Sequence, residues 1–112
     1  LNFIPYFYAA IFNYDITQNA ILELENPTPD ITKIANIVNA HQEILDKKLN
    51  NTPQEMIFMM KAAENAGASA VKIVGSGGGG CFFAMTDLES EQKVIDSIMD
   101  AGARSAFSVN LI

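Results

Sequence analysis

The 112-residue sequence predicts a single α+β domain, in which a layer of helices covers a small, mainly antiparallel sheet and extra helices precede it. Three observations predict this class. Proline- and asparagine-rich breaks divide the first half into helical segments. In the second half, helical periodicity alternates with short apolar runs, and a glycine-rich loop joins two of those runs directly. A chain of this length buries roughly two thirds of its unfolded surface, which is enough for one core.

The first helices are predicted from their boundaries. Asp15 and Gln18 have the spacing of a capping box. In such a box the Asp15 side chain accepts a backbone N–H, and the Gln18 side chain reaches back to the start of the helix. A short helix is therefore expected over residues 16–26. The preceding residues 3–13 are apolar without a clean period, and we expect a separate helix there.

Two further helices begin at proline-marked sites. Thr28 can cap a helix over residues 29–49, because apolar residues follow it at three- and four-residue spacing. Thr52 begins a capping box with Pro53 at the first helical position, so a third helix is expected there. Gly67 supplies the left-handed residue at which that helix ends.

The remaining elements follow from two apolar runs and one amphipathic segment. Residues 70–74 and 81–85 are short apolar runs typical of strands. Asp87 caps a helix over residues 88–101, and residues 105–111 alternate enough to predict a third strand. The link between the first two strands is too short for a parallel crossover, so they should pair antiparallel. The helix before the third strand provides a right-handed crossover. This order predicts a ferredoxin-like fold that lacks its first strand.

The composition restricts the classes of partner. Seven basic and 13 acidic residues give a net charge of −6, which argues against nucleic acid and anionic membranes as partners. The apolar start, residues 4–12, lacks the basic flank of a secretory signal and is too short to span a bilayer. The single cysteine, Cys81, forms no internal disulfide, so we expect a cytoplasmic protein and a buried structural thiol. Because residue 1 is Leu, we expect a fragment of a longer parent protein.

The strongest functional signal is the loop between the two predicted strands. Five of its six residues are glycine, at a considerable entropic cost. Such a loop allows backbone N–H groups to surround a phosphate, although a flexible turn or close packing explains it equally. The dinucleotide fingerprint fails because the loop enters a strand rather than a helix. A P-loop fails because no Gly-Lys pair ends it.

This loop and its flanks resemble the third conserved motif of the GHMP kinases. The motif spans residues 71–85, VKIVGSGGGGCFFAM, and the resemblance extends upstream to residues 39–42, NAHQ, covering roughly residues 30–110. It implies the C-terminal domain of a two-domain kinase that transfers a phosphoryl group from Mg-ATP to a substrate hydroxyl, chemistry that depends mainly on positioning and charge stabilisation. ATP and Mg²⁺ would be bound mainly by the N-terminal domain of the same parent chain.

The resemblance also implies roles for residues of this chain. The isolated fragment should be inactive, with no catalytic residue or metal ligand of its own. Asn39 together with His41 favours a galactokinase-like enzyme acting on a sugar, and His41 is a candidate substrate contact. Galactose, heptose, mevalonate and homoserine all remain open as substrates. The candidate nucleotide-binding residues are those of the loop: Gly75, Ser76, Gly77, Gly78, Gly79 and Gly80.

Two further readings compete. Lys72 either projects toward a phosphate or is a solvated lysine at a sheet edge.

The element order also permits a regulatory module similar in outline to ACT domains, in which glycine-bearing loops hold an amino acid at a dimer interface. Against that module stands the helical first half, which it does not need.

Overall fold

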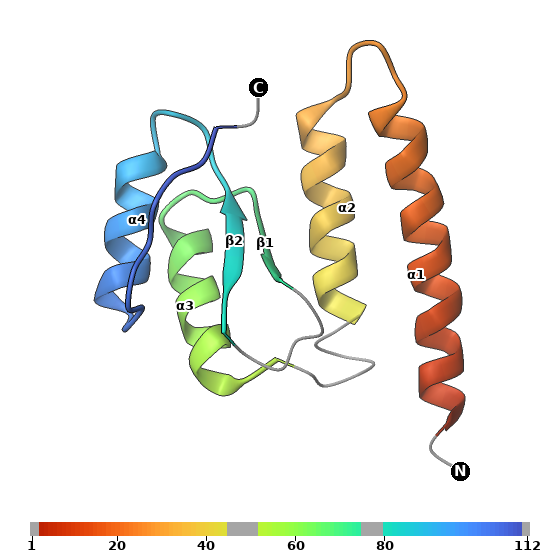
Figure 1. Ribbon diagram of the computed structural model, residues 1–112, viewed down its shortest axis with the longest axis horizontal. Coiled ribbons are helices and arrows are strands. Elements are labelled where there is room, and N and C mark those ends of the chain that lie inside the picture. The colour runs from red at the N-terminus through yellow and green to blue at the C-terminus, as the bar shows by residue number, and fades with distance from the viewer. Residues whose placement is uncertain (1–2, 45–51, 75–79, 111–112) are drawn as a thin grey trace.

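The computed structural model has the α+β class that the sequence predicts, with four helices and a two-stranded sheet in its described residues (Figure 1). It describes residues 3–44, 52–74 and 80–110, with side chains in the first helix from residue 14 onward. The elements, in order, are α1 (Phe3–Leu24), α2 (Ile31–Ile44), α3 (Gln54–Asn65), β1 (Ala70–Ile73), β2 (Phe82–Met85) and α4 (Glu91–Asp100). Among the described helices, none has the length and hydropathy of a membrane-crossing segment.

Helix α1 is one continuous element of 22 residues, so the predicted boundary at Asp15 is wrong. Asp15 and Gln18 both lie within the helix and therefore cap nothing. No proline or glycine interrupts the chain between residues 6 and 24, so the ladder of backbone hydrogen bonds continues through Asp15. The helix packs against α2 as an antiparallel pair (Figure 1).

Helix α2 is capped by Asp30 rather than by Thr28. The Asp30 carboxylate accepts hydrogen bonds from the backbone N–H of Thr32 at 2.9 Å and of Lys33 at 3.4 Å. Thr28 instead belongs to the preceding turn, where its N–H donates to Asn26 Oδ1 at 3.0 Å. A carboxylate at the positive end of the helix dipole caps more favourably than a hydroxyl. The predicted end near residue 49 lies outside the described residues.

Helix α3 starts at Gln54, one residue after Pro53, the predicted first position. The Thr52 hydroxyl oxygen accepts a hydrogen bond from Gln42 Nε2 at 3.0 Å. Gly67 ends the helix with φ +118°, which confirms the predicted left-handed stop.

Helix α4 is shorter than the predicted 88–101. The Asp87 carboxylate accepts a hydrogen bond from Ser90 N–H at 2.8 Å, so it orders a turn over residues 88–90 rather than the first turn of the helix. The helix proper starts at Glu91, and Gly102 follows it with φ +114°.

Strands β1 and β2 pair antiparallel, with Lys72 opposite Phe83, and this confirms the predicted hairpin. The predicted third strand is wrong over residues 105–110, which form no strand, while residue 111 lies outside the described part. This segment runs from the end of α4 toward the C-terminus (Figure 1), and Phe107 and Val109 are 79% and 72% exposed. An extended segment becomes a strand only when the edge of a neighbouring strand forms hydrogen bonds with its backbone. The described two-stranded sheet does not pair with residues 105–110.

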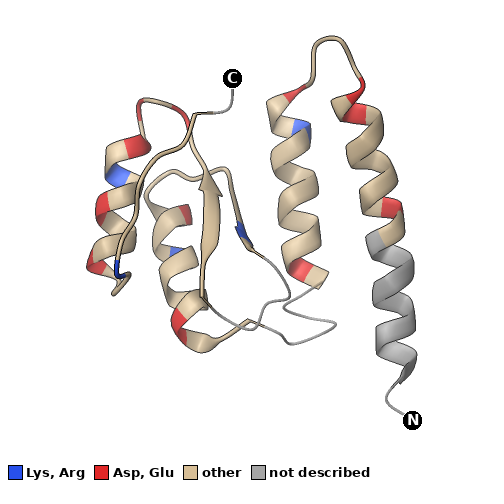
Figure 2. Cartoon of the chain, viewed as in Figure 1, with Lys and Arg blue, Asp and Glu red and all other residues tan. Residues whose placement is uncertain are grey.

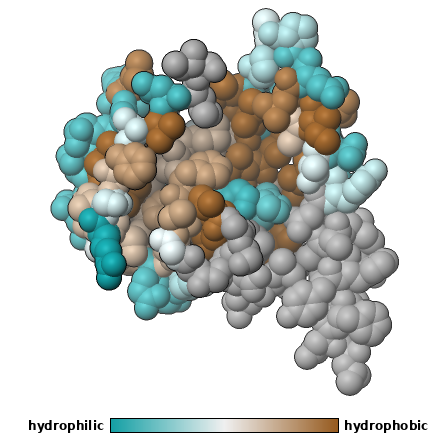
Figure 3. Space-filling model, in the orientation of Figure 1, coloured by the Kyte–Doolittle hydropathy of each residue, from teal (hydrophilic) through white to brown (hydrophobic). Residues whose placement is uncertain are grey.

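The core lies between the hairpin and the helices α3 and α4. Helix α2 lies on the other side of β1 (Figure 1). Hydrophobic side chains gather over the middle of the face seen in Figure 3, and hydrophilic ones over the outer helices. The buried core residues come from α3, its C-terminal end, β1 and α4: Met56, Met60, Ala63, Ala66, Val71, Ile73 and Val94. The α+β class and the antiparallel pairing of the two strands are therefore confirmed, and the ferredoxin-like layer of helices on a fuller sheet stays a prediction.

Candidate functional site

The glycine loop connects the ends of β1 and β2. Val74 N–H donates to the Cys81 carbonyl at 3.1 Å and closes the hairpin immediately below it. Gly80 has φ +107°, a conformation that favours glycine, and a Cβ placed there would meet no atom within 4 Å. Its positive φ therefore explains this glycine without a close packing partner. The other candidate residues, Gly75, Ser76, Gly77, Gly78 and Gly79, lie outside the described residues, and their nucleotide-binding role stays a prediction.

The outer edge of β1 is bonded by two amide side chains of α2. Asn39 Oδ1 accepts a hydrogen bond from Val71 N–H at 3.2 Å, and Gln42 Oε1 accepts one from Ile73 N–H at 2.9 Å. Asn39 Nδ2 also donates to the Ser69 carbonyl at 2.9 Å. Alternate N–H groups of an antiparallel strand point away from its partner and need acceptors elsewhere. We call this set of three hydrogen bonds the amide clamp.

Sequence reasoning missed the amide clamp, although it left a signal. Asn39 and Gln42 are three residues apart and therefore share one face of the helix. Gln42 is also only 4% exposed, the one buried polar side chain in the described part of the chain. Its Nε2 donates to Thr52, so this single amide connects α2, the start of α3 and β1.

His41 lies between the two clamp residues in sequence and is half-buried. Its pKa is lowered, first by burial and second by the positive charge of Lys72. Both effects favour the neutral imidazole. The predicted contact between His41 and a substrate stays a prediction.

Lys72 occupies the middle of β1, and it is not the fully solvated edge lysine that the sequence suggested. The side chain is half-buried, and burial lowers the pKa of its ammonium group. Lys72 Nζ donates to the Ile73 carbonyl at 3.1 Å. Figure 2 shows the colour of Lys and Arg on β1, whose sequence AVKI contains one basic residue.

Cys81 is exposed, so the expectation of a buried structural thiol is wrong. It immediately precedes β2, opposite Val74, which is itself exposed. At this end of the hairpin the core helices no longer cover the chain, whereas Ile73, one residue before Val74, is fully buried.

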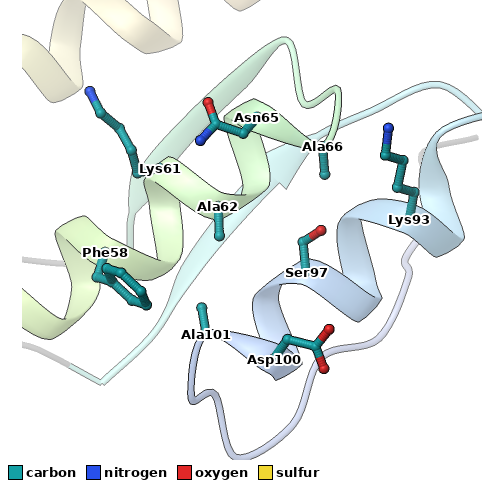
Figure 4. A pocket seen from close by; sticks show the side chains of 9 residues that line it. All are labelled: Phe58, Lys61, Ala62, Asn65, Ala66, Lys93, Ser97, Asp100 and Ala101. Carbon is teal, nitrogen blue, oxygen red and sulfur yellow. The ribbon is translucent and has the colours of Figure 1, made fainter.

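A separate groove of about 480 Å³ runs between α3 and α4, outside the hairpin (Figure 4). Lys61 and Lys93 lie on its two walls, and small residues such as Ala62 form its floor. His41 and Gly80, the predicted site residues that the structure describes, do not line it. In the described part of the chain, no group of three or more His, Cys, Asp or Glu residues has an arrangement suited to a metal ion.

Comparison with known proteins extends this picture. Residues 20–104 match the family described as "GHMP kinases C terminal". The chain is 30% identical over 88 residues to a mevalonate kinase of Pyrococcus horikoshii, an alignment covering 79% of this chain and 26% of that protein. It is 32% identical over 80 residues to a mevalonate kinase of Thermococcus onnurineus, covering 71% and 23%.

The chain thus spans about a quarter of the length of these relatives. No solved structure matches it. The family match includes the whole of α2, the β1–loop–β2 hairpin and α4, so the amide clamp and the glycine loop both fall within it. The chain therefore belongs to the GHMP kinase family and carries its C-terminal domain.

Proposed function

We propose that this chain is the C-terminal domain of a longer kinase that transfers the terminal phosphoryl group of ATP to a hydroxyl of a small acceptor. The observation that carries the proposal is the glycine-loop hairpin within the matched region, held in place by α2. Phosphoryl transfer depends on positioning and on stabilising negative charge, and a backbone loop that joins two paired strands suits that task.

The described residues also suit an anionic reactant. The half-buried ammonium group of Lys72 lies on the strand that leads into the loop, in a chain whose net charge is −6. A local cation offsets the repulsion that such a chain exerts on phosphate groups. ATP supplies the phosphoryl group and Mg²⁺ neutralises its charge. We propose that the N-terminal domain of the parent provides most of their ligands.

A mevalonate-type acceptor is favoured over a sugar. Both relatives described above are named mevalonate kinases, and neither is a sugar kinase. The galactokinase-like prediction relied on Asn39 together with His41. The amide of Asn39, however, is occupied with the backbone of Ser69 and Val71. That pairing therefore gives no reason to prefer a sugar.

The test is release of ADP by the full parent protein with Mg-ATP and a panel of mevalonate, galactose, a heptose and homoserine. We expect saturable ADP release with mevalonate and background release without an acceptor. Phosphorus NMR should detect one new phosphomonoester. The isolated 112-residue chain should release no ADP, because it lacks most of the proposed nucleotide site.

Other outcomes would change the assignment. Turnover with galactose alone would restore the sugar kinase reading and contradict the mevalonate type. A parent that releases no ADP with any acceptor, but binds an amino acid at micromolar concentration with dimerisation, would replace the kinase with a regulatory ligand-binding module.

A further inference from the structure

The face of the hairpin opposite the core carries a cation and an aromatic ring side by side. Successive side chains of a strand point to opposite faces. Val71 and Ile73 pack into the core, so Lys72 between them lies on the other face. Its cross-strand partner Phe83 lies on that same face and is 42% exposed, whereas Phe82 packs against the core. Directly opposed side chains in an antiparallel pair are close enough to share a ligand.

The amide clamp positions a third group at this face. Its two hydrogen bonds to the strand fall on Val71 and Ile73, the residues on either side of Lys72. The register between α2 and β1 is therefore fixed at Lys72. His41 lies between the two clamp residues on α2, and the charge of Lys72 contributes to lowering the pKa of its imidazole.

The ammonium group of Lys72 is half-buried on β1, and burial lowers its pKa. The one hydrogen bond found for its ammonium group goes to the neutral carbonyl of Ile73, which leaves two N–H donors for another acceptor. Charges removed from water are normally paired, so this arrangement fits an anion that comes from outside the described chain.

We propose that Lys72, with His41 and Phe83 beside it, forms a subsite for the anionic group of the acceptor substrate. This inference rests on the proposed kinase function and adds the substrate class, a small hydroxy acid. The ammonium group of Lys72 pairs with the carboxylate, the neutral imidazole of His41 adds a hydrogen-bonding group without a competing charge, and the Phe83 ring lies against the apolar carbons. Lys72 is thus a binding residue, and the residues of the amide clamp are positioning residues that hold Lys72 in place.

The kinetic test uses the full parent kinase with Lys72→Met, Lys72→Arg and the surface control Lys61→Met on α3. In Lys72→Met we expect the KM for the acceptor to rise about tenfold, because a charge-assisted hydrogen bond is lost. The KM for ATP should stay unchanged. Lys72→Arg should recover most of the affinity, and Lys61→Met should behave as the unmodified enzyme. A thermal melt of each variant separates loss of folding from loss of binding.

The two possible sources of the anion, the acceptor and ATP, give different kinetic results. A rise in the KM for ATP alone would assign the subsite to a nucleotide phosphate, and would overturn the acceptor assignment. Unchanged KM values for both reactants in a folded Lys72→Met variant would overturn the subsite altogether.

A second readout does not depend on turnover. Inorganic phosphate or mevalonate is titrated into the parent protein while NMR follows the pKa of His41. An anion bound to Lys72 should raise that pKa toward its ordinary value in the unmodified protein, and should leave it unchanged in Lys72→Met. A parent that shows this shift but no kinase activity would retain the anion subsite and lose the proposed function. Absence of the shift would count against the subsite alone.

Discussion

Three polar residues of α2 lie within four positions of the sequence but make different interactions. Asn39 and Gln42 use their amides on the backbone of β1, while His41 between them remains an ionisable group beside Lys72. In sequence, the NAHQ segment belongs to the region that resembles the GHMP kinases. In space, two of its side chains accept the hydrogen bonds of β1 N–H groups that a neighbouring strand would otherwise accept, and the substrate contact of His41 stays a prediction.

The ionisation of His41 should make the chain less stable in mild acid. Its pKa is lowered in the folded chain from an ordinary value of 6.5, so the unfolded chain binds the proton more readily. Stability is therefore fully present above about pH 6.5 and decreases as the pH falls through the window below it. Urea unfolding at pH 8 and at pH 5 measures this change. We expect a smaller difference between the two pH values in His41→Gln, and an equal difference would contradict the effect.

At the scale of elements, helix ends follow local chemistry where competing signals are weak. The stops at Gly67 and Gly102 and the start after Pro53 are predictable, because glycine and proline restrict the backbone regardless of distant contacts. The start of α2 is harder to predict from the sequence. Thr28 and Asp30 are both acceptable caps, and the choice depends on the turn that α1 and α2 make together.

The two glycine stops provide a matched pair of substitutions. Gly67→Ala and Gly102→Ala both force alanine into a positive φ, with values of +118° and +114°, at a cost of about 1–2 kcal/mol each. At Gly67 the added Cβ would also lie 3.0 Å from Ser90 Oγ and 3.2 Å from Ser90 Cβ, whereas at Gly102 it meets nothing within 4 Å. Gly67→Ala should therefore lower the thermal midpoint further. In a Ser90→Gly background the two substitutions should cost the same, and a persistent difference would rule out the contact with Ser90.

At the scale of the whole molecule, the sequence predicts those elements that depend only on residues near them in the chain. The hairpin of β1 and β2 is predictable because a short glycine loop permits only antiparallel pairing. Three features depend on which parts of the β1–β2 sheet other elements cover. They are the amide clamp, the exposure of Cys81 and the absence of a strand over residues 105–110. Segment 105–110 alternates like a strand, but periodicity alone does not show whether a partner edge is available.

The amide clamp also makes the two edges of the sheet unequal. The register pairs Val71 with Ala84 and Ile73 with Phe82. Because the N–H groups of Val71 and Ile73 point away from β2, those of Ala84 and Phe82 point away from β1, toward an edge with which no described strand pairs.

Amide hydrogen exchange should reveal this asymmetry residue by residue. In deuterated buffer we expect the amides of Val71 and Ile73 to exchange at least about tenfold more slowly than those of Phe82 and Ala84. Gln42→Leu should accelerate exchange at Ile73 more than at Val71, while the exposed control Asn36→Ala on the same helix should change neither. Equal rates along both strands would mean that the clamp opens freely in solution. If the rates differ as expected, α2 closes one side of the sheet permanently, and any further strand can join only along β2.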